Sequence, residues 1–208
     1  MKTIITKYPI WSFLIINYLI SWSFLYPCYQ LILNNDEIPP LAFIGLIGGY
    51  GPTIAAILVQ WIIDKSELKR LLLKIIQFRI SAKVLAIIIL IPILLYILSQ
   101  GVSTIIFGGE MALDPAKPLK GILVWILLAL PFGPMGEELG WRGYMLPKLL
   151  ARHSVIKSTI LVGLAWGVWH LASFTFPGAA IPSFLPVNLW TIILFCCNTI
   201  GISMIYTY

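Results

Sequence analysis

Long runs without charged residues dominate the chain and predict helices that cross a membrane. These runs cover residues 8–35, 38–63, 84–109 and 158–208, and a further run begins at Gly121. A transmembrane helix needs about 20 apolar residues to cross a hydrocarbon core of about 30 Å. Residues 158–208 suffice for two crossings, and Pro177, Pro182 and Pro186 divide them near the middle. The pattern therefore predicts an all-α, multi-pass transmembrane helix bundle of about six spans, with residues 1–208 as a single integral membrane domain.

The segment 64–83 is too polar to cross a membrane. Asp64 and Glu67 have the spacing of a capping pair at a helix N-terminus. Apolar residues then recur at helical spacing with basic residues between them, at Leu68, Leu71, Leu72, Ile75 and Ile76. This pattern predicts an amphipathic helix on the cytoplasmic membrane surface, whose basic residues hold anionic lipid.

Composition and charge narrow the class of protein further. Of the residues, 60% are hydrophobic and only 11% are charged, whereas a soluble domain carries about 25% charged residues. A soluble globular protein is therefore excluded. The net charge of +6 does not require nucleic acid as a partner, because 12 of the 14 basic residues fall on the side of the N-terminus and only Lys117 and Lys120 fall on the other. Cytoplasmic loops carry such an excess, so we predict a cytoplasmic N-terminus.

Two adjacent carboxylates mark the fourth span as the candidate for chemistry. Residues 121–136 are uncharged but cover only about 24 Å, so the helix either carries Glu137 and Glu138 into the membrane or ends at Gly136 and leaves them solvated. Ionisable residues inside a span are costly and indicate function. Glu138 and Arg142 have the i, i+4 spacing of a helical ion pair. Glu137 is rotated by about 100° from Glu138 and can face another helix.

The candidate partner of Glu137 is His170, which lies within the fifth span. Trp166 and His170 share one helix stripe, and Gly163 and Gly167 beside it permit close helix packing. A lone histidine in a span can equally be a core residue, so both readings stand. Glu137 and His170 lie at similar expected depths in the membrane. We therefore predict that the two side chains face each other between spans four and five.

The hexapeptide EELGWR at 137–142 resembles the EExxxR motif of the CAAX protease and bacteriocin-processing family, also called the Abi or type II CAAX prenyl endopeptidase family. The pentapeptide WGVWH at 166–170 resembles the second family motif, an aromatic residue followed four positions later by histidine. The segment GPTIAA at 51–56 is typical of bacterial members. The resemblance implies an intramembrane endopeptidase in which Glu137 activates water with the help of His170. Glu138 and Arg142 would hold the site together.

The resemblance also bears on the cofactor and on the length of the chain. Members of the family are often described as metalloproteases, so a divalent metal such as zinc is implied, with no ligands assigned in this sequence. A further family motif, histidine followed four positions later by Asn or Asp, lies in a later span. No histidine follows His170. We therefore expect these residues to lack the last family span or spans, as a C-terminally truncated chain would.

Three hypotheses for the function follow. The leading one is an intramembrane endopeptidase in the cell membrane that acts on a membrane-associated peptide or protein. The alternative is a non-catalytic membrane protein that confers bacteriocin self-immunity or binds a peptide. The third is a transporter-like bundle that uses Glu137 to carry protons. An enzyme requires Glu137 and His170, whereas a peptide-binding protein would tolerate their loss. Membrane lipid is an expected partner in each case.

Overall fold

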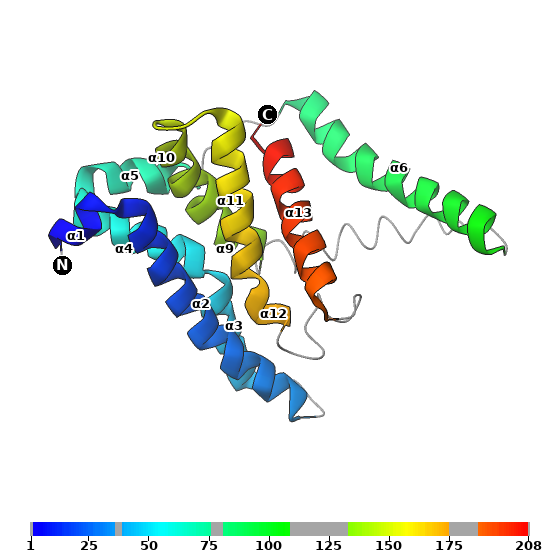
Figure 1. The fold of residues 1–208 in the computed structure, drawn as a ribbon, viewed down its shortest axis with the longest axis horizontal. Helices are drawn as coiled ribbons and strands as arrows, with labels where there is room; N and C mark the ends of the chain where they lie inside the picture. Colours follow the sequence, from blue (N-terminus) through cyan, green and yellow to red (C-terminus); the bar gives the residue numbers. More distant parts are fainter. Residues whose placement is uncertain (1, 36–38, 76–80, 109–132, 175–186, 208) are drawn as a thin grey trace. The chain divides into compact units, whose positions relative to one another are not determined.

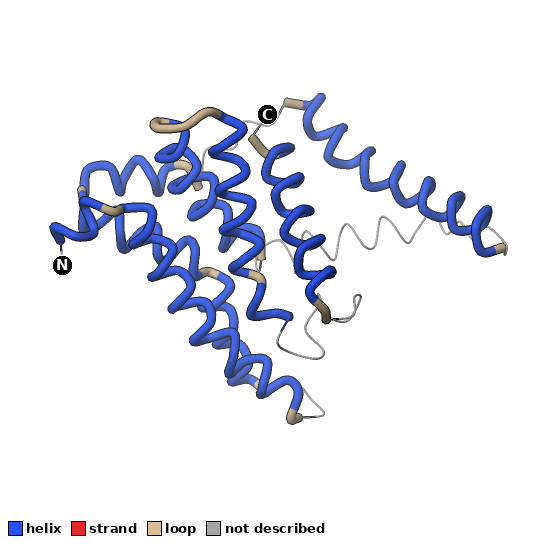
Figure 2. Tube along the Cα trace, viewed as in Figure 1, coloured by secondary structure: helices blue, strands red, loops and turns tan. Residues whose placement is uncertain are grey.

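The structure, a computed structural model, describes residues 2–35, 39–75, 81–108, 133–174 and 187–207. The described residues form helices and no strand, which confirms the predicted all-α helix bundle (Figures 1 and 2). They divide between two compact units, one built from 1–75 and 132–208 and the other from 76–131. The described part of the second unit is the single helix α6 (Ala82–Phe107), which lies within two residues of the predicted third span.

The first unit contains helices from both halves of the chain. The N-terminal half has α1 (Lys2–Lys7), α2 (Pro9–Leu33), the 3-10 helix η1 (Pro40–Ile44), α3 (Gly45–Gly49), α4 (Gly51–Ile63) and α5 (Lys65–Leu73). The C-terminal half has α9 (Pro134–Glu138), the π-helix η3 (Leu139–Met145), α10 (Leu146–Leu150), α11 (Val155–Trp169), α12 (Leu171–Phe174) and α13 (Leu189–Ile205).

Three of the described helices are long and apolar enough to cross a membrane. They are α2, the part of α6 at Ile89–Ile106, and the continuous helical segment Val155–Phe174 that joins α11 and α12. A fourth span results if the segments Pro40–Gly49 and Gly51–Ile63 are counted together. Helix α13 is apolar but shorter, with 17 residues. The start of the predicted fourth span, residues 121–132, lies outside the described residues.

The predicted second span is not one straight helix. Its two halves meet at an angle of 53° next to Tyr50. Pro52 lies in the first turn of α4, where its missing N–H costs nothing, but it cannot donate a hydrogen bond that would continue α3 into α4. Gly48, Gly49 and Gly51 surround the break, and glycines of this kind weaken a helix and ease a kink.

The helix predicted after Asp64 is present and is shorter than expected, and its position on the cytoplasmic membrane surface stays a prediction. Asp64 caps α5 by accepting hydrogen bonds from the backbone N–H of Ser66 at 2.8 Å and from the Ser66 hydroxyl at 2.7 Å. These bonds lower the pKa of the Asp64 carboxyl. The helix ends at Leu73, and residues 76–80 lie outside the described residues. Leu71 is buried, and the ammonium group of Lys74 donates to the Gly143 carbonyl at 2.8 Å, so this segment packs on η3.

Helices α2 and α11 lie side by side in the same direction (Figure 1). The Tyr18 hydroxyl donates to the Ala165 carbonyl at 2.8 Å, and one turn further along both helices the Trp22 indole donates to the Trp169 carbonyl at 3.0 Å. The Trp169 indole in turn donates to the hydroxyl of the fully buried Ser21 at 2.7 Å. Spans one and five therefore run parallel, as a regular alternation of crossings requires.

Glycines on α11 determine how closely α13 packs against it. A Cβ atom on Gly163 would lie 2.5 Å from the Ile200 Cα, and one on Gly167 would lie 3.0 Å from the Cys196 Sγ, so α11 and α13 pack closely and antiparallel. The glycine stripe predicted beside His170 thus serves close packing. The sequence placed α13 as the next span after α11, and the antiparallel direction agrees with that order.

Candidate active site

The segment that carries the two carboxylates is held tightly against the break in the second span. A Cβ atom on Gly136 would lie 2.9 Å from the Gly49 carbonyl oxygen, and one on Gly140 would lie 2.5 Å from the Pro52 carbonyl oxygen. No side chain fits at either glycine without movement of backbone. The backbone around Glu137 is therefore fixed relative to α3 and α4, which is a requirement for a precisely placed catalytic group.

The helix does not end at Gly136. It continues through Glu138 into the π-helix η3 and then into α10. Glu137 is 9% exposed, and the Glu138 side chain is 40% exposed. The reading in which both carboxylates are solvated at the end of a helix is therefore wrong for Glu137. The π-helix was not predicted, and such segments are rare and occur frequently at functional sites.

Glu137 makes one direct hydrogen bond to another helix. The indole N–H of Trp166 donates to Glu137 Oε2 at 2.6 Å. A distance this short is typical of a strong hydrogen bond to a carboxylate oxygen. Its other oxygen, Oε1, accepts no hydrogen bond from a described residue. Glu137 is thus oriented by one oxygen and leaves the other available.

The predicted ion pair between Glu138 and Arg142 is present. Arg142 Nη1 lies 2.8 Å from Glu138 Oε1, and the Arg142 side chain is only 12% exposed. The guanidinium group lies over the Trp166 ring at 4.6 Å and over the Tyr206 ring at 5.0 Å. Arg142 Nε and Nη2 are buried and have no hydrogen-bond partner among the described residues. The guanidinium is therefore held by three groups, and the three N–H bonds on Nε and Nη2 have no partner among the described residues.

His170 lies at the end of α11 and is oriented by Trp166. Its Nδ1 is 2.9 Å from the Trp166 carbonyl oxygen. Since a carbonyl can only accept, the bonded Nδ1 carries the proton, and the neutral ring then has a free lone pair on Nε2. The rings of Trp169 and Phe195 pack against the imidazole at 4.7 Å and 5.2 Å.

Trp166 connects the two candidate reactive groups. Its indole donates to Glu137, and its carbonyl contacts His170. No direct hydrogen bond between Glu137 and His170 occurs within the described part of the chain, so their predicted sharing of one water stays a prediction. The sequence singled out Trp166 as part of a motif but did not assign its indole to Glu137. Tyr206 had no sequence signal at all, because its role depends on how α13 packs.

A zinc site cannot be assembled from the described residues alone. No group of three or more His, Cys, Asp or Glu side chains lies together in that part of the chain. A catalytic zinc ion takes three protein ligands and keeps one position open. Glu137 and His170 would supply at most two.

Fold and site together define a membrane helix bundle with a buried carboxylate, an ion-paired arginine and an oriented histidine. Residues 119–208, which contain all of these groups, match the family model of the type II CAAX prenyl endopeptidases, Rce1-like. A curated relative, the CAAX prenyl protease 2 of Methanococcus maripaludis, is 39% identical over 84 residues. That alignment covers 40% of this chain and 29% of the relative, so the chain spans less than a third of the relative by this match. The resemblance predicted from the two motifs is confirmed for this segment.

Proposed function

We propose that the protein is an intramembrane endopeptidase of the CAAX protease type, which hydrolyses a peptide bond in a membrane-associated peptide or protein. The observation that carries this proposal is the buried Glu137 carboxylate, with Oε2 fixed by Trp166 and Oε1 without a described partner. The match of residues 119–208 to endopeptidases supports it. The name of the curated relative indicates prenylated CAAX proteins as the first substrates to test.

In the proposed reaction, Glu137 acts as the general base. A water molecule bound at Oε1 gives one proton to Glu137, and the remaining hydroxide adds to the carbonyl carbon of the peptide bond. The tetrahedral intermediate then collapses, the bond between carbon and nitrogen breaks, and Glu137 returns its proton to the leaving amine. The net reaction consumes one water molecule and one peptide bond and yields a carboxylic acid and an amine, and Glu137 returns to its starting state. A positioned acid or base contributes about 10²–10⁴-fold to such a rate.

The other site residues have supporting roles in this mechanism. The free N–H groups of Arg142, Nε and Nη2, are suited to bind the oxyanion of the intermediate. Glu138 holds the guanidinium in place through their ion pair. The unprotonated Nε2 of His170 offers the attacking water a second acceptor. These three residues and Glu137 were all candidates from the sequence. The structure adds the Trp166 indole, which orients Glu137.

We propose the cell membrane as the location, with the N-terminus in the cytoplasm. The support is the concentration of basic residues on one side together with the directions of the helix pairs. Under this orientation α5 and the segment that joins α10 to α11 face the cytoplasm.

A peptidase assay with matched glutamate variants tests the proposed function. The protein, expressed from its complete reading frame, is incubated in liposomes with a farnesylated CAAX peptide and with its unprenylated form. Glu137→Gln should lower cleavage by at least about 100-fold without lowering the thermal unfolding temperature. Glu67→Gln is the control, because Glu67 is exposed on α5 and pairs with Arg70 at the surface. Cleavage that persists in Glu137→Gln would refute the assignment of the base and favour a non-catalytic peptide-binding protein.

A further inference from the structure

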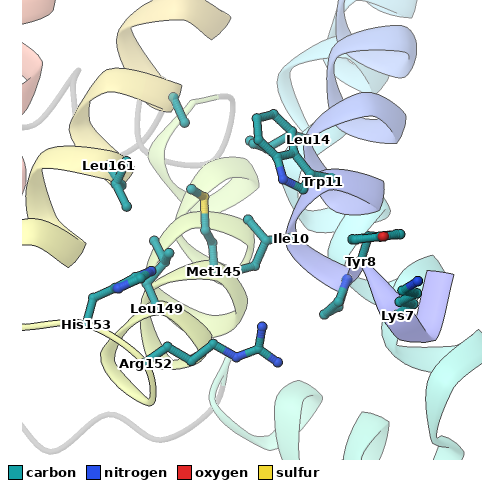
Figure 3. Close-up of a pocket in the computed structure, with 12 residues that line it drawn as sticks. Lys7, Tyr8, Ile10, Trp11, Leu14, Met145, Leu149, Arg152, His153 and Leu161 are labelled. Atoms are coloured by element: carbon teal, nitrogen blue, oxygen red, sulfur yellow. The ribbon is translucent and has the colours of Figure 1, made fainter. Parts of the chain in front are cut away.

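A cavity of about 350 Å³ lies between the start of α2, the segment formed by the end of η3 and α10, and the middle of α11. Figure 3 shows it from the side, with α2 on the right and α10 and α11 on the left. It is formed by residues other than those of the candidate active site. Its volume lies within the range of about 300–1,000 Å³ that small-molecule sites occupy.

The interior of this cavity is apolar. Side chains of α2, η3, α10 and α11 form it, namely Ile10, Leu14, Met145, Leu149, Leu161 and Ala165. Met145 and Leu149 are buried and form its base, whereas Ile10 and Leu14 of α2 are partly exposed along its side. An apolar trough that opens between two spans fits a hydrocarbon chain rather than a polar metabolite.

The rim of the cavity is positively charged. Lys7 and Arg152 line it from opposite sides, and no aspartate or glutamate is among the lining residues. Neither cation forms an ion pair with a described carboxylate. In Figure 3 the Arg152 guanidinium extends toward the junction of α1 and α2, where Lys7 and Tyr8 lie. The two cations are therefore free to bind one anionic group at the rim.

The aromatic residues at the mouth indicate its depth in the membrane. Tyr8 and Trp11 line the cavity and are 48% and 66% exposed. Tyrosine and tryptophan are enriched at the level of the lipid headgroups. Lys7 and Arg152 thus lie at the height of lipid phosphates, and the apolar trough extends from there toward the centre of the bilayer.

We propose that this cavity is a binding site for one anionic phospholipid of the cytoplasmic leaflet. Lys7 and Arg152 bind its phosphate and anionic headgroup, and one acyl chain lies along Ile10, Leu14 and Leu161. Basic pockets between transmembrane helices on the cytoplasmic side bind anionic headgroups by the same combination of charge and apolar contact. The charge of the rim selects an anionic lipid over a zwitterionic one.

The test is a lipid titration of the purified protein in detergent. Phosphatidylglycerol should raise the thermal unfolding temperature more than phosphatidylcholine does, because a ligand that binds only the folded state stabilises it. Native mass spectrometry should show one phosphatidylglycerol retained per protein. The double variant Lys7→Gln, Arg152→Gln should weaken phosphatidylglycerol binding by about 30-fold and remove the difference between the two lipids.

A matched double variant separates a site from general surface charge. Lys69→Gln, Lys157→Gln removes two exposed cations from the same membrane side, and neither residue lines the cavity. This control should keep the preference for phosphatidylglycerol. An equal loss in both double variants would overturn the proposal, and so would equal stabilisation of the unmodified protein by the two lipids. Ala165→Trp, which fills the trough, should reduce retention of the lipid while both cations remain, and full retention in this variant would also overturn the proposal.

Discussion

The hydrogen bond from Trp166 to Glu137 offers the sharpest test of the proposed site. Trp166→Phe removes the indole N–H, which lies 2.6 Å from Glu137 Oε2, but keeps an aromatic ring in place. The ring that faces the Arg142 guanidinium at 4.6 Å is thus largely retained. The substitution separates the orientation of the carboxylate from the packing around it.

The expected effect follows from the strength of this bond. A hydrogen bond to a charged group contributes about 1.5–3 kcal/mol, and about 1.4 kcal/mol corresponds to a factor of ten in rate. We therefore expect kcat for peptide cleavage to fall by about 10–100-fold. KM should change little, because Trp166 holds the base rather than the substrate. Initial rates over a range of substrate concentrations measure both constants.

A second tryptophan provides the control. The Trp22 indole also donates one hydrogen bond, to the Trp169 carbonyl at 3.0 Å, but its acceptor is a neutral backbone group away from Glu137. Trp22→Phe should leave kcat near the wild-type value. If Trp166→Phe keeps full kcat, or loses no more than Trp22→Phe, then the indole does not position the base and the reasoning fails.

Three further predictions concern stability and topology. Arg142→Ala leaves the Glu138 carboxylate, which is 40% exposed, without its ion-pair partner, so we expect about 1.5–3 kcal/mol of lost stability, seen as less folded protein after purification; an unchanged yield and an unchanged unfolding temperature would contradict it. Gly163→Ala would bring a methyl group 2.5 Å from the backbone of α13 and should lower the unfolding temperature, whereas Gly201→Ala, which meets open space, should not; equal effects would exclude close packing as the cause. A topology reporter fused after Asp36 should lie outside the cytoplasm and one fused after Lys69 inside, and the reverse pattern would invert the proposed orientation.

Sequence by itself determined the features that depend on local patterns or on the membrane. Apolar runs of sufficient length must form helices in lipid, because every backbone polar group needs an internal partner there. For this reason the ends of α2 and α6 were predicted within about two residues. The ion pair between Glu138 and Arg142 was also predictable, since the two residues lie one turn apart on the same helix.

Tertiary structure decided the features that depend on contacts between distant segments. Trp166 and Glu137 are 29 residues apart, and no periodicity indicates which of several tryptophans donates to which carboxylate. Tyr206 reaches Arg142 only because α13 packs antiparallel against α11. The backbone on either side of the break at Tyr50 packs directly against Gly136 and Gly140. Sequence spacing does not reveal this contact.

The cavity rimmed by Lys7 and Arg152 also depends partly on the sequence pattern and partly on tertiary packing. Each cation was predicted to lie on the cytoplasmic side because charge distribution alone orients a membrane protein. Their meeting at one cavity depends on the parallel packing of α2 against α11, which the hydrogen bonds of Tyr18 and Trp22 maintain. Hydrophobicity thus determined which segments enter the membrane, whereas side-chain packing between helices determined which polar groups share a site.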